Sequence, residues 1–254
     1  LSVAAPDTTD GSDDPSGHGT GESANLFATA PGINFIGVKM NNPTLAFRTA
    51  ARLRPDVITC SRGYHVDFPG TSMPSWLRPL YLEILNAVRN GTIVCFAGGN
   101  GHRAFPANMP QVIAVGGTVV RSDLSVRATE YASSFDSSWF PGRHVPDLTG
   151  LCGEPPTADY IVLPVPQTSA LNQHDGWGAF SGTSAATPMV AGVAALLREV
   201  DPEISPADAK RVLQITARDV RAGKSRQGEL ATPGRDGATG YGLVDADRAV
   251  NALV

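Results

Sequence analysis

The sequence predicts an α/β fold in which a mainly parallel, twisted sheet is covered by helices on both faces. Three observations lead to this prediction. Short apolar runs of strand length alternate with amphipathic stretches of helical length. Most connections between them are short, as expected when helices cross from one parallel strand to the next. Finally, small and polar residues gather where apolar runs end, which is where parallel sheets of this class hold their chemistry.

Taken in order, an apolar run at residues 33–40 predicts a buried strand, and residues 44–54 have helical spacing until Pro55 ends the helix. Residues 56–60 predict the next strand. The clearest amphipathic helix covers residues 74–90, with one apolar stripe, and Gly91 closes it. Two more strands are predicted at residues 92–97 and 112–116, and two more helices at residues 187–200 and 206–216.

The composition suits one globular domain over residues 1–254. Hydrophobic residues make up 42% of the chain, enough for a sizeable core without a disulfide framework. Lys and Arg number 20 against 24 Asp and Glu, a net charge of −4, so we expect no nucleic-acid partner. No apolar run is long enough to predict a membrane span. The three cysteines are an odd number, which weakly disfavours a disulfide-rich secreted protein.

Two loops are predicted from clusters of Gly, Pro, Ser and Asp, at residues 7–17 and at residues 142–178. The second is long for a compact domain. Connections of that length commonly bind a ligand or move, although a tolerated surface insertion explains the composition equally well.

Three short segments hold residues suited to catalysis. Ser184 stands just before an apolar helix, where free N–H groups favour a developing negative charge, although an ordinary helix cap has the same pattern. His18 lies between glycines, and imidazole is suited to take a proton from a hydroxyl near neutral pH, although a loop histidine is also common. Asn100 follows a buried strand among glycines and could donate to an oxyanion, although alone it indicates a turn.

Together these segments resemble the subtilisin family (the subtilases). The resemblance rests on Ser-Gly-His-Gly-Thr at residues 16–20, Cys-Ser-Arg-Gly at 60–63, and Ala-Gly-Gly-Asn at 97–100 with the strand that follows it. Gly-Thr-Ser-Ala-Ala-Thr-Pro-Met-Val-Ala-Gly at residues 182–192 is a near match to the nucleophile motif, and residues 241–246 resemble the closing segment of the family.

The resemblance implies a subtilisin-like three-layer fold and a serine endopeptidase that acts on peptide or protein substrates without a cofactor. It implies Ser184 as the nucleophile, His18 as its base, and Asn100 as an oxyanion donor beside the backbone N–H of Ser184. It also implies a substrate-binding set, in which substrate adds to the enzyme as a strand: Ser61, Arg62, Gly63, Gly98 and Gly99.

The catalytic aspartate of the family has no clean copy in this sequence. Asp7 is a weak candidate, because its segment aligns better with the part of the family pattern that leads directly into the histidine. We therefore expect the N-terminal portion of the domain to be missing from this chain, which has the character of a processed piece of a longer precursor. A separate N-terminal fragment of that precursor would then be a partner that supplies the aspartate.

Two further departures concern ions and specificity. The stretch at residues 20–32 lacks the insertion that often builds a calcium site in this family, so we expect no metal there. Arg62 replaces the usual apolar residue, and the short loop after Asn100 brings His102 and Arg103 toward the expected specificity pocket. We expect these cationic groups to favour acidic or polar substrate side chains, although solvated arginines with their stems folded down would give the same sequence.

Two competing functions fit parts of the sequence. An α/β-hydrolase needs its serine before its histidine, whereas all five histidines here precede Ser184, so that class is excluded. A catalytically impaired scaffold used for binding remains an alternative, although it would not need the histidine, asparagine and serine motifs together. The expected location is secreted or extracytoplasmic, with a cytoplasmic one left open.

Overall fold

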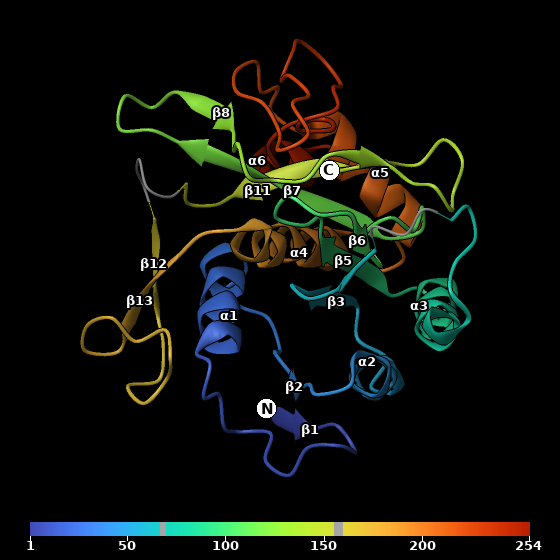
Figure 1. Cartoon of the computed structure of the whole chain (residues 1–254), viewed down its shortest axis with the longest axis vertical. Helices are drawn as coiled ribbons and strands as arrows, with labels where there is room; N and C mark the ends of the chain where they lie inside the picture. Colours follow the sequence, from blue (N-terminus) through green and yellow to red (C-terminus); the bar gives the residue numbers. More distant parts are fainter. Residues whose placement is uncertain (67–69, 155–159) are drawn as a thin grey trace.

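A five-stranded sheet forms the centre of the computed structural model, which describes residues 1–66, 70–154 and 160–254. Four strands run parallel in the order β11-β7-β5-β3, and β8 pairs with β7 in the antiparallel sense. Their bounds are β3 (Val57–Cys60), β5 (Ile93–Ala97), β7 (Ile113–Val120), β8 (Val126–Ala128) and β11 (Leu148–Leu151). The predicted parallel α/β architecture is thereby confirmed (Figure 1).

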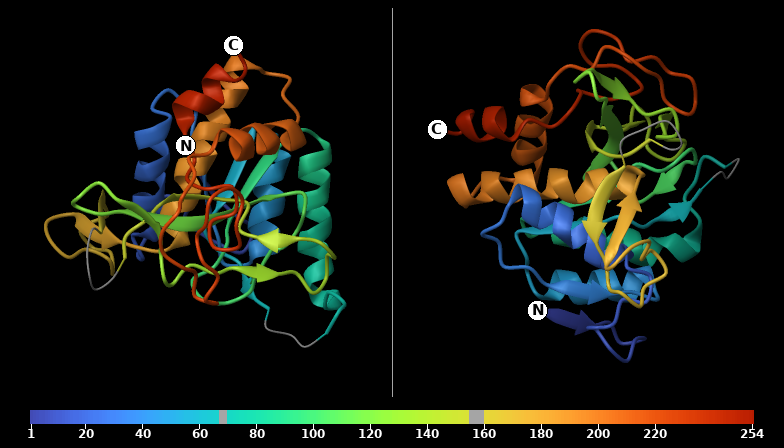
Figure 2. Two further views of the ribbon diagram at one scale, coloured as in Figure 1. Left: turned by 90° about the horizontal axis from the view of Figure 1, so that it is seen from above. Right: turned by 90° about the vertical axis from the view of Figure 1, so that its left-hand side faces the viewer.

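Helices cover both faces of this sheet. Their bounds are α1 (His18–Thr29), α2 (Pro43–Arg52), α3 (Arg78–Arg89), α4 (Thr183–Val200), α5 (Pro206–Thr216) and α6 (Ala246–Asn251), with a short 3-10 helix η1 (Ser75–Leu77). In the left view of Figure 2, α2 and α3 lie on one side of the sheet and α1 and α4 on the other. The result is the three-layer arrangement that the sequence predicts.

Alternation along β5 explains why the sheet needs cover on both sides. Val94 and Phe96 belong to the core under α2 and α3, whereas Ile93 and Cys95 belong to the core under α4 and α5. All four side chains are buried. Since successive side chains of a strand point to opposite faces, a strand that is apolar throughout is stable only between two layers.

Within the described residues, four two-stranded pairings lie outside the central sheet. They are β1 (Ser2–Ala4) parallel to β2 (Gly37–Lys39), and three antiparallel pairs: β4 (Tyr64–His65) with β6 (Ala104–Phe105), β9 (Phe135–Asp136) with β10 (His144–Val145), and β12 (Ile161–Pro164) with β13 (Trp177–Phe180). Figure 1 shows β1 and β2 beyond the β3 edge of the sheet. In the right view of Figure 2, β12 and β13 lie beside α1.

Several predicted boundaries need correction. The strand predicted at residues 33–40 is confined to Gly37–Lys39, and the helix predicted from residue 187 begins at Thr183. The long loop predicted at residues 142–178 is wrong in part, because it contains β10, β11, β12 and the start of β13; its residues 155–159 lie outside the described residues. Helix α1 is an element that the sequence did not predict.

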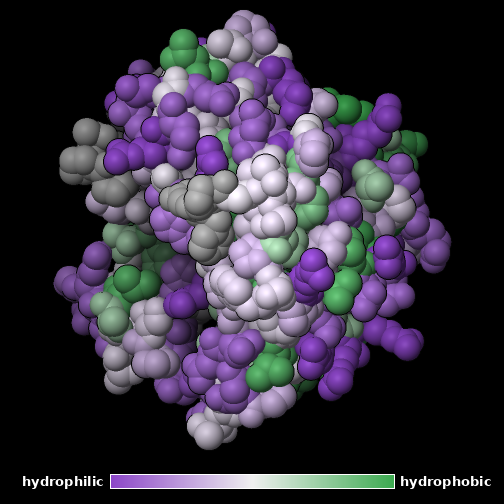
Figure 3. Space-filling view, turned by 45° about the vertical axis from the view of Figure 1, so that its right-hand side comes forward, coloured by the Kyte–Doolittle hydropathy of each residue, from purple (hydrophilic) through white to green (hydrophobic). Residues whose placement is uncertain are grey.

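In the part of the chain that the structure describes, no helix is long and apolar enough to cross a membrane. On the face drawn in Figure 3, hydrophobic residues occur in small groups among polar ones.

Candidate active site

Ser184 lies in the first turn of α4, immediately beyond the carboxyl ends of the parallel strands. The helix begins after Gly182, whose φ of 105° is a conformation that side chains disfavour. The Ser184 hydroxyl donates to the carbonyl of Ser61 at 3.2 Å, and the Ser61 hydroxyl donates to the carbonyl of Ser184 at 2.9 Å. This exchange joins the segment after β3 to the start of α4.

Asn100 follows β5 and is fixed by the same helix. Its Oδ1 accepts from the backbone N–H of Thr183 at 2.9 Å and from the Thr183 hydroxyl at 3.0 Å. The backbone N–H of Gly99 donates to that hydroxyl at 3.2 Å. Because a backbone N–H can only donate, the amide must present Oδ1 to Thr183, which leaves Nδ2 as a donor toward the space beside Gly182.

His18 is the first residue of α1, where its side chain is 29% exposed. The helix start is held by Asp14, whose carboxylate accepts from the backbone N–H of Gly17 at 3.0 Å and from the N–H and hydroxyl of Thr20, both at 2.8 Å. Gly17 itself has a φ of 79°. The imidazole is thereby placed at the amino-terminal end of α1, a helix that packs against α4.

The surroundings of His18 keep its imidazole neutral near pH 7. Burial lowers its pKa, the positive charge of Arg62 lowers the pKa further, and the carboxylate of Asp14 acts in the opposite direction. A neutral imidazole can accept a proton from a hydroxyl. In this structure the Ser184 hydroxyl donates to the Ser61 carbonyl and not to His18. This does not argue against His18 as a base, because in many enzymes the contact between nucleophile and base tightens only when substrate binds.

The glycines of the predicted substrate-binding set lie where another stretch of backbone approaches closely. A Cβ on Gly63 would lie 2.5 Å from the carbonyl oxygen of Phe105, and one on Gly99, whose φ is 112°, would lie 2.7 Å from the carbonyl oxygen of His102. Gly98 donates its N–H to Val115 at 2.8 Å. Gly63 and Gly99 are therefore required by packing, whether or not they touch substrate.

Asp7, the weak candidate for the third catalytic residue, is engaged elsewhere. Its carboxylate accepts the backbone N–H of Asn42 at 2.6 Å, and its carbonyl accepts from the Asn41 amide at 3.0 Å. Asn42 is the residue that caps α2. In this structure the Asp7 carboxylate therefore binds the residue that caps α2, and so stabilises the start of that helix.

A residue that the sequence analysis missed does contact His18. Glu22 lies one turn later in α1, and its Oε1 is 3.5 Å from Nε2 of His18. The spacing of four residues could have indicated this contact, but only if α1 had been predicted.

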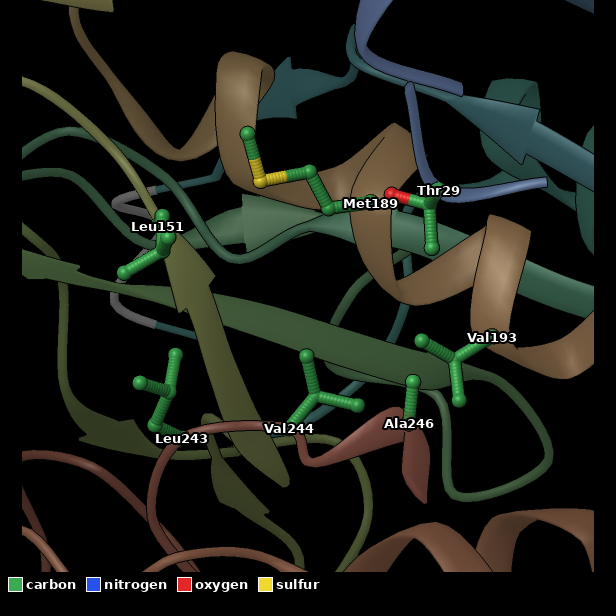
Figure 4. Close-up of a pocket in the computed structure, with 7 residues that line it drawn as sticks. All are labelled: Thr29, Leu151, Met189, Val193, Leu243, Val244 and Ala246. Atoms are coloured by element: carbon green, nitrogen blue, oxygen red, sulfur yellow. The ribbon is translucent and has the colours of Figure 1, made fainter. Parts of the chain in front are cut away.

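A pocket elsewhere in the molecule has no predicted site residue in its lining. Figure 4 shows side chains from α1, α4, β11, α6 and the segment before α6 around it: Thr29, Leu151, Met189, Val193, Leu243, Val244 and Ala246. Its lining is mostly apolar, so it offers few groups for chemistry.

Comparison with known proteins identifies the family of this chain. The family model described as the subtilase family matches residues 2–242. The chain is 25% identical over 250 residues to alkaline elastase YaB of Bacillus sp. (strain YaB), covering 93% of this chain and 56% of that protein. It is 32% identical over 178 residues to an extracellular protease of Xanthomonas campestris pv. campestris, covering 67% of this chain and 25% of that protein.

Solved structures show the same fold. Fervidolysin from Fervidobacterium pennivorans, a keratinolytic enzyme related to subtilisin, matches with a TM-score of 0.71 and 20% identity, over 96% of this chain and 37% of that one. The chain spans between a quarter and just over half of the length of the two sequence relatives. Since the subtilase family model matches residues 2–242, nearly the whole chain, the chain belongs to the subtilase family.

Proposed function

We propose that this chain is a serine endopeptidase whose nucleophile is Ser184 and whose base is His18. One observation carries the proposal. Asn100 is hydrogen-bonded to the first turn of the helix that holds Ser184, so the proposed oxyanion donor and nucleophile are held in fixed positions relative to each other. The neutral imidazole of His18, at the neighbouring helix end, supports it.

The reaction follows from these three groups. His18 takes the proton of the Ser184 hydroxyl while the oxygen attacks the carbonyl carbon of a peptide bond. The negative charge on the former carbonyl oxygen is met by Nδ2 of Asn100 and the backbone N–H of Ser184, at the positive end of α4. His18 then gives its proton to the departing amine, and water releases the acyl group by the same steps in reverse.

Substrate backbone would lie along the segments that follow β3 and β5. Ser61, Arg62 and Gly63 form one side, and Gly98 and Gly99 the other. Ser61 is already hydrogen-bonded to Ser184, so a peptide paired with this segment would pass the nucleophile. Arg62 is exposed and its charge acts on His18, which supports the expectation that acidic or polar substrate side chains are favoured.

An N-terminal fragment of the same precursor is the partner that we propose for this domain. Among the described strands, β3 ends the path of the central sheet and β2 pairs only with β1. An added strand between β2 and β3 would join the two sheets through backbone hydrogen bonds and could bring an aspartate toward His18. Hydrogen exchange tests this. The amides of β3 should be better protected in the complete precursor than in this chain, and equal protection would contradict the partner.

The extracellular protease among the relatives supports a secreted or extracytoplasmic location for this chain. Fractionation of cells that express the complete precursor tests this, and recovery of the product only from the cytoplasm would contradict it.

Labelling with a fluorophosphonate, followed by peptide mass spectrometry, tests the catalytic proposal. We expect the label on Ser184, none on Ser184→Ala, and unchanged labelling of Ser72→Ala, a control at an exposed serine. Hydrolysis of casein should fall by up to about 10⁶-fold in Ser184→Ala. Absence of label on Ser184 in both the chain and the complete precursor would favour a binding scaffold.

A further inference from the structure

Glu22 lies on the same side of α1 as His18, one turn further into the helix. Its Oε1 is 3.5 Å from Nε2 of His18, and its side chain is 10% exposed. The next residue toward His18, Gly21, packs against the ring of Phe180, so tightly that a Cβ there would come within 2.2 Å of the ring. The Phe180 ring also lies beside His18, with centroids 6.4 Å apart. The Glu22 side chain is thus largely buried beside the imidazole of His18.

The carboxyl of Glu22 has spare acceptor capacity. Neither of its oxygens has a hydrogen-bond partner among the described residues. An unpaired carboxyl is costly to bury, and burial raises the pKa of Glu22 to about 8. Glutamates are seldom buried without a partner, so a buried one beside a candidate base is a functional candidate.

The other carboxylates that could serve His18 are occupied. Asp14 accepts three hydrogen bonds from Gly17 and Thr20, which fix the start of the helix. Asp7 accepts from Asn42. The cation that faces His18 is Arg62, which opposes protonation of the imidazole. Of these three carboxyl groups, that of Glu22 contacts the ring and is not committed elsewhere.

We propose that Glu22 is a positioning residue for His18, a carboxyl within this chain that orients the imidazole and stabilises it when it becomes charged. The inference rests on the proposed protease function. A hydrogen bond from Nε2 to Glu22, formed when the two groups come closer than 3.5 Å, would fix the tautomer and leave Nδ1 to act as the base. When His18 takes the proton of Ser184, the imidazolium lies beside Glu22, and an ionised carboxylate there lowers the energy of that state. An added strand that carries aspartate would supplement this contact.

Glu22→Gln is the central variant because it keeps the shape of the side chain and removes its ionisation. The second-order rate of fluorophosphonate labelling is measured for this chain between pH 5 and 10. We expect Glu22→Gln to label about 10²-fold more slowly, a smaller loss than the about 10⁴-fold seen when a triad aspartate is replaced in serine proteases. The unmodified chain should gain rate through about pH 8 as Glu22 ionises, and the variant should lack this rise. Glu22→Asp should recover part of the rate.

Controls separate this role from a structural one. Glu199→Gln, at an exposed position near the end of α4, should label at the normal rate. Peptide hydrolysis should show a lower kcat with little change in KM. Each variant is checked by circular dichroism, and Glu22→Met replaces Glu22→Gln if the latter does not fold.

The outcomes are distinct. If Glu22→Gln labels at the normal rate and with the same pH profile while Ser184→Ala does not label, the role of Glu22 is wrong and the protease function stands. A slower rate with an unchanged pH profile would assign Glu22 a structural role and also overturn the inference. If Ser184→Ala labels as well as the unmodified chain, the proposed function itself fails.

Discussion

The side-chain oxygen of Asn100 accepts a hydrogen bond from the backbone N–H of Thr183 across 2.9 Å. This contact joins the end of β5 to the start of α4 and decides which way the amide faces. Ser184 and Asn100, the proposed nucleophile and oxyanion donor, are consequently held at a fixed separation, which is what preorganised stabilisation of a tetrahedral intermediate requires.

Asn100→Asp separates the two roles of this side chain. Aspartate keeps an oxygen for Thr183 but removes the Nδ2 donor and places a negative charge beside the oxyanion. We expect kcat for peptide hydrolysis to fall by at least about 10²–10³-fold, the loss typical of removing one oxyanion donor, with little change in KM. Asn251→Asp, at an exposed position in α6, is the matched control. Retained turnover in Asn100→Asp would exclude Asn100 as the donor.

Arg62 should influence both the base and the choice of substrate. Its positive charge lowers the pKa of His18 in addition to burial, so Arg62→Gln should move the acidic limb of the kcat/KM profile to higher pH. A peptide library should show loss of preference for acidic side chains in the same variant. A preference for large apolar side chains in the unmodified chain would contradict the specificity prediction. Arg89→Gln, exposed at the end of α3, serves as control.

Glu22 should make stability depend on pH. Its pKa is raised from 4.5 to about 8 in the folded chain, so between these values the folded state holds a proton that the unfolded state has lost. The free energy of unfolding should therefore fall as pH rises through this window, by about 1.4 kcal/mol for each pH unit. Glu22→Gln removes this dependence, so its stability relative to the unmodified chain should increase from pH 5 to pH 8. Urea unfolding at both pH values measures the difference, and a constant difference would contradict the raised pKa.

Asp147 should be a main determinant of stability at the amino ends of the parallel strands, opposite the end that holds the candidate site. Its buried carboxylate binds the guanidinium of Arg143 through both oxygens and lies 2.9 Å from Nζ of Lys210. It also accepts from the backbone N–H of Ala114 in β7 at 2.7 Å. Asp147→Ala would leave two mostly buried cations without their partner, and we expect a loss of about 3–5 kcal/mol in urea unfolding. Asp123→Ala, fully exposed, should change stability little.

The elements that the sequence predicts well are those with local signals. Helix α5 has the bounds that the sequence predicts because Ser205 caps it and Pro206 occupies its first position. Pro55 lies just before strand β3, which begins at Val57. Asn42 caps helix α2, and Pro43 is the first residue of that helix. In each case the residues that start or end the element lie within one turn of it.

The elements that the sequence misses depend on distant contacts. Helix α1 has glycines at positions 19 and 21, which disfavour a helix, and it is held by Asp14 and by packing against α4. Strands β12 and β13 pair across more than ten residues, so neither run has a turn signal that indicates its partner. Ser184, His18 and Asn100 could be named from their motifs, whereas Glu22 could not, because its contact with His18 exists only once α1 has formed.

Helix α4 contacts β3, β5, β7 and β11 as well as α1, and its first turn holds Ser184, the proposed nucleophile. Ser184 therefore lies on a helix that packs against all four parallel strands of the central sheet. Heating should therefore abolish the labelling of Ser184 and melt the domain in one transition, and the temperature at which half the labelling is lost should coincide with the Tm.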